Sequence, residues 1–192
     1  MARITALDRE HVAPRAGALL DAVKQKLGMV PNMMRTMAQS AAVLDGYLAL
    51  NAALARGQLG GRVGEQIALL TAEQNGCAYC AAAHTALGKG GGLSDADIDA
   101  ARSGRASDAK AAAALALARA VIETRGHVAD ADITAARKAG LADGEIGEVV
   151  AHVALNVFTN YFNSLADTDV DFPAVRPPRK PHTDRQHVAV SA

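Results

Sequence analysis

The stretch EQIALLTAEQNGCAYCAAAH, from Glu65 to His84, contains both cysteines of this 192-residue chain. Residues that favour helices lie on both sides of Asn75-Gly76, and such a dipeptide is typical of a helix end. The pattern predicts one helix over 63–73 and a second over 77–89. If these helices fold back on each other, they form a hairpin around which the other helices can pack.

The rest of the chain continues this helical pattern. Apolar residues recur every three or four positions, and glycine, proline, serine or aspartate separates the segments. No stretch long enough for a strand alternates apolar and polar residues. Further helices are predicted over 15–27, a short segment from 31, then 41–54, 95–102, 107–124, 130–140 and 143–165. We therefore expect an all-α fold.

Composition limits the classes of function. Half of the residues are apolar, yet the chain has three Phe, three Tyr and no Trp, so small aliphatic side chains must fill a tightly packed core. The formal net charge is zero, which argues against nucleic-acid or membrane partners. No apolar stretch is long enough for a signal peptide or a membrane span. We expect a cytoplasmic protein.

The domain organisation follows from a change in composition near Pro173. Residues 1–172 are predicted to form a single helical domain. The remainder, PAVRPPRKPHTDRQHVAVSA, contains four prolines and few large apolar groups, so it cannot continue a helix or pack a core alone. We expect residues 173–192 to be a basic tail, either disordered or packed as an arm on a neighbouring subunit.

The two cysteines and the histidine are spaced for one helix face. Three residues separate Cys77 from Cys80 and four separate Cys80 from His84, so their side chains are neighbours on a helix. Cys77 lies near the helix start, where unpaired N–H groups and the helix dipole lower the pKa of a thiol. His84 can take the proton of Cys80 or stabilise its thiolate, which is the nucleophilic form.

Glu65 joins this group if the hairpin forms. It lies about 15 Å before the turn along one helix, and His84 lies about 12 Å after the turn along the other. Its carboxylate could then orient the imidazole or relay its proton. In this predicted chain Glu65 orients His84, His84 is the base and Cys80 is the nucleophile. Cys77 lies beside them.

The two cysteines also have structural interpretations. Free cysteine is often a buried, inert residue, but the accompanying His84 and Glu65 argue for function. Cys77, Cys80 and His84 supply at most three zinc ligands where a structural site needs four, so we expect neither a metal nor a cofactor. His152, the asparagines of the last predicted helix (Asn156, Asn160, Asn163) and the methionines at 29, 33, 34 and 37 were interpreted as packing or hydrogen-bonding residues.

The spacing Glu-x11-Cys-x2-Cys-x3-His, formed by Glu65, Cys77, Cys80 and His84, resembles the signature of AhpD-like alkylhydroperoxidases, which belong to the carboxymuconolactone decarboxylase-like superfamily. Two flanking stretches resemble its peroxidase-related branch. They are LGMVPNMMRTMAQSAAVLDGYLAL (27–50) and HVALNVFTNYFNSLADTDVDFP (152–173). The resemblance covers about residues 10 to 175. It implies an AhpD-like helical bundle, a homo-oligomer (dimer, trimer or hexamer) and thiol-dependent reduction of a hydroperoxide with an antioxidant role.

The resemblance also implies roles for the residues. Cys80 would be the peroxidatic thiol and Cys77 the resolving thiol, with His84 and Glu65 as a proton relay and a dithiol or protein thiol as electron donor. The best-known members have a second histidine where this chain has Tyr79, an accessory hydrogen-bond donor by this interpretation. The alternatives are a thiol–disulfide oxidoreductase or redox sensor using the same pair, or a non-redox, decarboxylase-like protein.

Overall fold

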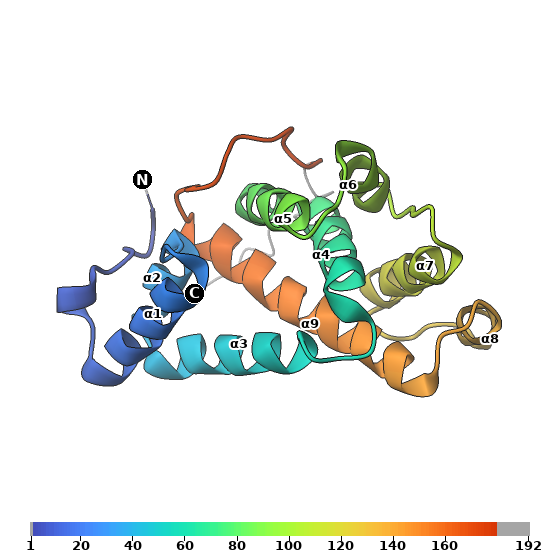
Figure 1. The fold of residues 1–192 in the computed structure, drawn as a ribbon, viewed down its shortest axis with the longest axis horizontal. Coiled ribbons are helices and arrows are strands. Elements are labelled where there is room, and N and C mark those ends of the chain that lie inside the picture. The colour runs from blue at the N-terminus through green and yellow to red at the C-terminus, as the bar shows by residue number, and fades with distance from the viewer. Residues whose placement is uncertain (1, 180–192) are drawn as a thin grey trace, which may run out of the picture.

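The computed structural model describes residues 2–179, and every regular element in that part of the chain is a helix (Figure 1). The all-α prediction is therefore confirmed. A short 3-10 turn, Arg9–His11, precedes α1 (Pro14–Leu27), α2 (Asn32–Met37), α3 (Ala41–Leu54), α4 (Gly60–Asn75), α5 (Ala78–Gly90), α6 (Asp95–Arg102), α7 (Ala109–Thr124), α8 (Asp130–Lys138) and α9 (Asp143–Ala166). None of these helices is long and apolar enough to cross a bilayer.

The long helix α9 runs through the middle of the molecule, with α3, α4, α5 and α7 packed around it (Figure 1). One apolar core joins α4, α7 and α9 and includes the fully buried Leu70, Leu115 and Val149. A second core joins the N-terminal helices to α5 and includes Leu44 and both cysteines. The cysteine pair thus lies in the interior, beside the central helix.

The hairpin of α4 and α5 forms as predicted. Gly76 ends α4 in the left-handed conformation, with φ 66°, which glycine adopts without steric cost. Cys77 follows as the N-cap of α5, and its backbone N–H donates to the Ala72 carbonyl across 3.0 Å. The two helices pack along their length, which brings their inward faces together.

The start of α4 differs from the prediction. The sequence predicts a helix that starts at residue 63, yet α4 already begins at Gly60. The Glu148 carboxylate of α9 accepts hydrogen bonds from the backbone N–H groups of Gln58 and Leu59, both at 2.9 Å. A carboxylate at this position stabilises a helix N-terminus. Because Glu148 is distant in the sequence, the local pattern contains no sign of this cap.

The segment after α9 returns over α2 and α5. Asp171 accepts a hydrogen bond from the Tyr79 hydroxyl, and Phe172 packs edge-on against the Tyr79 ring at 5.7 Å between centroids. Farther along, the Arg179 backbone N–H donates to Glu73 of α4. The described part of the predicted tail, 173–179, therefore lies against its own chain, and the rest of that prediction falls outside the described residues.

Candidate functional site

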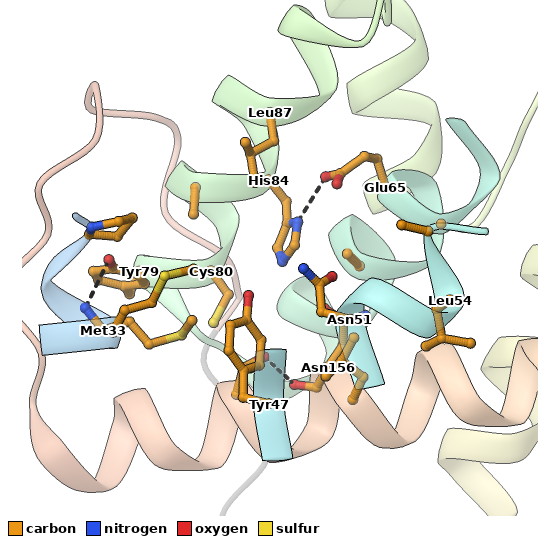
Figure 2. A pocket seen from close by; sticks show the side chains of 18 of the residues that line it. Met33, Tyr47, Asn51, Leu54, Glu65, Tyr79, Cys80, His84, Leu87 and Asn156 are labelled. Carbon is orange, nitrogen blue, oxygen red and sulfur yellow. Dashed lines mark hydrogen bonds and ion pairs between the residues drawn. The ribbon is translucent and has the colours of Figure 1, made fainter. Parts of the chain in front are cut away.

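A cavity of about 230 Å³ lies between α3, α4, α5 and α9 (Figure 2). Cys80, His84 and Tyr79 of α5 line it together with Glu65 of α4. The residues that line the cavity do not include Cys77. Most of the remaining wall is apolar, including Met33, Leu54 and Leu87. Four of the five predicted site residues thus meet at one cavity, and the fifth is hidden behind it.

Glu65 and His84 are in contact, as the hairpin predicts. The Glu65 Oε2 atom and the His84 Nδ1 atom are 2.8 Å apart, and both side chains are partly buried. Burial alone would lower the pKa of His84, but the charge and hydrogen bond of Glu65 outweigh it, so the pKa is raised. With Nδ1 directed at Glu65, the other ring nitrogen points into the cavity (Figure 2). The pair can hold and deliver a proton there.

The sulfur atoms of Cys77 and Cys80, at the start of α5, make different hydrogen bonds. Cys77 is the N-cap of α5, and its Sγ accepts a hydrogen bond from the Cys80 backbone N–H at 3.2 Å. Both thiols are free, and each cysteine is 2% exposed. The Asn163 side chain of α9 donates to Cys80 Sγ at 3.3 Å. The cavity, the amide and the histidine all lie on the Cys80 side.

The pKa values of the two thiols move in opposite directions. Burial disfavours the Cys80 thiolate, but the hydrogen bond with Cys77, the charge of His84 and the amide of Asn163 outweigh it and lower the pKa to about 7. The hydrogen bond with Cys80 and burial raise the pKa of Cys77. The expectation that the helix start would lower the pKa of Cys77 was wrong, because a partner thiolate and burial dominate over the helix dipole.

Polar residues of α9 support the cysteine turn. Besides Asn163 at Cys80, the fully buried Asn160 accepts a hydrogen bond from the side chain of Asn75 at 3.0 Å. Asn75 is the last residue of α4, directly before the turn that leads to Cys77. Asn163 was predicted to be a packing or hydrogen-bonding residue and not a member of the site. The signal available was the recurrence of asparagine on one face of an apolar helix.

Two tyrosines, Tyr79 and Tyr47, line the cavity. The Tyr79 hydroxyl donates to Asp171 at 2.8 Å and accepts from the Met33 backbone N–H at 3.1 Å, so it ties α5 to α2 and to the segment after α9. Tyr47 of α3, which was not among the predicted site residues, extends its hydroxyl into the cavity near Cys80 and His84 (Figure 2). Burial and the negative charges of Glu65 and Cys80 raise its pKa, which keeps it a neutral donor.

One group of His, Asp and Glu side chains within residues 2–179 is close enough to hold a metal ion. It consists of Asp8, Glu10 and His11, which are exposed near the N-terminus and do not line the cavity. Exposed groups of this kind are common without an ion. The titratable side chains that line the cavity carry thiol, imidazole, carboxylate and phenol groups.

Three proteins of known structure illustrate the similarity of fold. A peroxidase-related protein with an alkylhydroperoxidase AhpD core from Ralstonia eutropha is 22% identical, with a TM-score of 0.81 over 88% of this chain and 92% of its own. A peroxidase-related protein from a Silicibacter species is 24% identical, with a TM-score of 0.75 over 86% and 91%. The debrominase Bmp8, solved as a variant with 2,3,4-tribromopyrrole, is 22% identical, with a TM-score of 0.74 over 88% and 91%.

Sequence comparison gives a matching family. No curated protein sequence matches the chain. The profile of the carboxymuconolactone decarboxylase family matches residues 41–123, from the start of α3 almost to the end of α7. That range contains Tyr47, Glu65, both cysteines and His84. The chain is thus similar to the carboxymuconolactone decarboxylase family over α3–α7, and its helices are arranged as in the alkylhydroperoxidase AhpD core.

Proposed function

We propose that this protein is a thiol-dependent hydroperoxide reductase with an antioxidant role. The observation that carries the proposal is Cys80, a buried thiol of lowered pKa that faces a mostly apolar cavity beside the Glu65–His84 pair. Lowered pKa supplies the thiolate at neutral pH, and the neighbouring pair supplies the proton that peroxide cleavage consumes. A peroxide is small enough to reach a sulfur atom that a macromolecule cannot touch.

In the first step the Cys80 thiolate attacks one oxygen of the hydroperoxide. An S–O bond forms while the O–O bond breaks, so sulfur loses two electrons to the peroxide. The departing alkoxide takes a proton from His84, whose charge Glu65 stabilises, and leaves as an alcohol. The Tyr47 hydroxyl is positioned to donate a hydrogen bond to the same oxygen. Cys80 is left as a sulfenic acid.

In the second step the Cys77 thiol displaces hydroxide from Cys80. An S–S bond forms, the S–O bond breaks, and the hydroxide leaves as water with the proton of Cys77. An external dithiol then reduces the disulfide by exchange and is itself oxidised to a disulfide. The high pKa of Cys77 suits this order, because the resolving thiol stays protonated until Cys80 has become electrophilic.

Burial argues against the alternative in which a protein disulfide is the first substrate. Both cysteines are 2% exposed, and Cys80 is reached through a cavity lined by side chains from six helices. Exchange with a protein disulfide requires the attacking sulfur to align with the S–S bond. Within the present geometry, a small electrophile meets that requirement more easily than a protein surface does.

Reductive removal of bromine is a competing use of the same thiols. The thiolate would take bromine from carbon, the carbon would gain a proton, and Cys77 would then displace bromide to form the disulfide. The fold shared with the debrominase Bmp8 makes a bromopyrrole a suitable competing substrate. Bromide release faster than any peroxide reduction would favour this function over ours.

The test compares peroxide consumption by wild type, Cys77→Ser, Cys80→Ser and His84→Ala, with dithiothreitol as donor. We expect no turnover with either cysteine variant, although Cys77→Ser should still consume one equivalent. His84→Ala should be slower by about 100-fold, whereas His127→Ala, which changes an exposed histidine, should match wild type. Survival of both thiols in excess hydroperoxide would refute the proposal, and a sulfenic acid trapped on Cys77 would reverse the two cysteine roles.

Two further expectations belong to this function. A cytoplasmic location would keep the cysteine pair reduced between turnovers. A homo-oligomer, whether dimer, trimer or hexamer, would cover the apolar side chains on the outer face of α9, where Phe158, Tyr161 and Leu165 are exposed. Both stay predictions for this chain.

A further inference from the structure

One face of α9 carries buried polar side chains from the cysteine pair to the far end of the cavity. His152, Asn156, Thr159 and Asn163 follow at intervals of four, three and four residues, so they share that face. They are 9, 4, 4 and 3% exposed. Asn163 contacts Cys80, while the other three line the cavity. Such a row is unusual inside an apolar bundle and calls for polar partners.

The row extends well beyond the reacting sulfur. At 1.5 Å per residue, Asn156 lies about 10 Å and His152 about 16 Å along α9 from Asn163. Figure 2 shows Cys80 and Tyr79 on one side of His84, and Leu54 on the other. A hydrogen peroxide molecule would therefore fill only the sulfur end of the cavity. The remainder has room for the body of an organic molecule.

The far end holds hydrogen-bonding groups that lack protein partners within the described residues. His152 Nε2 is buried and unpaired. Its ring packs directly on Gly64, where a Cβ would lie 2.8 Å from Cε1, so the glycine makes room for it. Asn156 Nδ2 donates to the His152 carbonyl, which leaves its Oδ1 as an acceptor. Unpaired buried groups cost free energy that a ligand can recover.

Asn51 of α3 adds a second amide to this end. It lines the cavity, and its side chain makes no hydrogen bond with residues 2–179. In Figure 2 the side-chain amide of Asn51 lies between Tyr47 and Leu54, below the ring of His84. Together the amides and the imidazole offer both donors and acceptors, which is the set that a hydroxyl group needs.

The charges around this end select against anions. Burial lowers the pKa of His152, although the charges of Glu148 and Glu65 oppose that shift, so the imidazole is neutral near pH 7. Both carboxylates would repel a negatively charged ligand group. At the same time Leu27, Met29 and Leu87 line the cavity although each is about 40% exposed, which suits an apolar ligand body.

We propose that Asn51, His152 and Asn156 form a second subsite, which binds an uncharged hydroxyl or carbonyl group of an elongated organic hydroperoxide whose –OOH group lies at Cys80. The inference rests on the proposed function, because it takes Cys80 as the reacting thiol. It makes the enzyme selective for hydroperoxides with a neutral polar group remote from the peroxide, over small or carboxylate-bearing ones.

The test uses cumene hydroperoxide and its para-hydroxymethyl and para-carboxyl analogues, which differ only at the end remote from the peroxide. We expect kcat/KM to be about fivefold higher for the hydroxymethyl compound than for the parent, from one added hydrogen bond, and lowest for the carboxyl compound. We call the ratio of kcat/KM for the hydroxymethyl compound to kcat/KM for the parent the hydroxymethyl preference. This ratio should fall toward one in each of the variants His152→Phe, Asn156→Leu and Asn51→Leu. Asn51→Leu tests the subsite even if the two α9 variants fail to fold, because Asn51 is only partly buried.

Thr159→Val is the matched control. Thr159 lines the same cavity, but its hydroxyl already donates to the Asn156 carbonyl at 3.1 Å, so the hydroxymethyl preference should stay as in wild type. Equal kcat/KM for the parent and hydroxymethyl compounds in wild type would overturn the subsite. The subsite would also be overturned if the hydroxymethyl preference stayed as in wild type both in Asn51→Leu and in every α9 variant that folds.

Binding separates failure of the subsite from failure of the peroxidase. The alcohols corresponding to the three hydroperoxides are titrated calorimetrically into the Cys80→Ser protein. Tighter binding of the hydroxymethyl alcohol, lost in Asn51→Leu, supports the subsite even if the wild type consumes no peroxide. Equal binding of parent and hydroxymethyl alcohols overturns the subsite even if cumene hydroperoxide is reduced.

Discussion

The Asn163 side chain of α9 donates a hydrogen bond to the Sγ atom of Cys80 on α5, across 3.3 Å in the protein interior. The two residues are 83 positions apart in the chain. A hydrogen bond to a thiolate stabilises the charged form, and its effect grows where water is excluded. The central helix therefore helps to set the reactivity of a cysteine that belongs to a different helical hairpin.

Replacing Asn163 by Leu should raise the pKa of Cys80 and slow its reactions at neutral pH. The amide favours the thiolate, and Leu removes that donor while keeping the side-chain volume. Alkylation of Cys80 by iodoacetamide, followed against pH in a Cys77→Ser background, measures the pKa directly. Ser164→Ala, an exposed neighbour on the same helix, is the control. An unchanged alkylation profile in Asn163→Leu would show that the amide does not stabilise the thiolate.

The rate of peroxide reduction should rise with pH, with its midpoint at about 7, which is the pKa of Cys80. Only the thiolate attacks, so the rate follows the deprotonated fraction, which is small at about pH 6 and nearly complete at about pH 8. An unperturbed thiol would reach half its maximal rate near about pH 8.5. His84→Gln should move the midpoint upward because it removes a positive charge. Stopped-flow measurement with excess peroxide tests both expectations, and a wild-type midpoint near that of a free thiol contradicts them.

Tyr79→Phe should reduce stability more than it changes the pKa of Cys80. The substitution removes the hydroxyl that donates to Asp171 and accepts from the Met33 N–H, and it leaves the latter group without its partner. We expect a loss of about 1–3 kcal/mol in the free energy of unfolding, measured by urea denaturation. Tyr161→Phe makes the same chemical change at an exposed position and should lose almost nothing. A normal stability with a strongly shifted Cys80 pKa would assign Tyr79 to the reaction itself.

Tyr47→Phe should show the opposite balance. Its hydroxyl lies in the cavity near Cys80 and makes no hydrogen bond with the described residues, so its removal costs little folding free energy. The rate of the first peroxide step should fall by about tenfold, since one donor to the departing oxygen is lost. Single-turnover kinetics at a pH above the Cys80 pKa isolate this step. A rate equal to wild type there would remove Tyr47 from the mechanism.

Arg102→Met should strongly destabilise the packing of α6 on α4. Arg102 Nε lies 2.8 Å from Glu73 Oε2, and the two side chains are 3% and 10% exposed. Breaking a buried ion pair leaves one uncompensated charge and costs about 3–5 kcal/mol. Arg56→Met, at an exposed position, is the control. Thermal and urea unfolding report the loss, and a second substitution, Glu73→Leu, should restore part of it.

Local sequence was sufficient to predict the helices and most residues of the candidate site. The 3.6-residue period of apolar residues, the Asn75-Gly76 stop and the Ser94 cap depend on interactions within one or two turns, so most helix bounds were predictable to within a few residues. Spacing on one helix placed Cys77, Cys80 and His84 on one side. The start of α4 was not predictable in this way, because its cap is Glu148 of α9.

Tertiary structure decided which thiol is the acidic one. From sequence, the helix start favoured a low pKa at Cys77, whereas in the folded chain Asn163 and His84 face Cys80 and the proton stays on Cys77. It also decided that Tyr47 faces the cavity while Tyr79 is held by Asp171. The physical reason is the range of the interactions. Helix formation is local, but desolvation, charge and hydrogen bonding at a buried sulfur depend on side chains brought from distant parts of the chain.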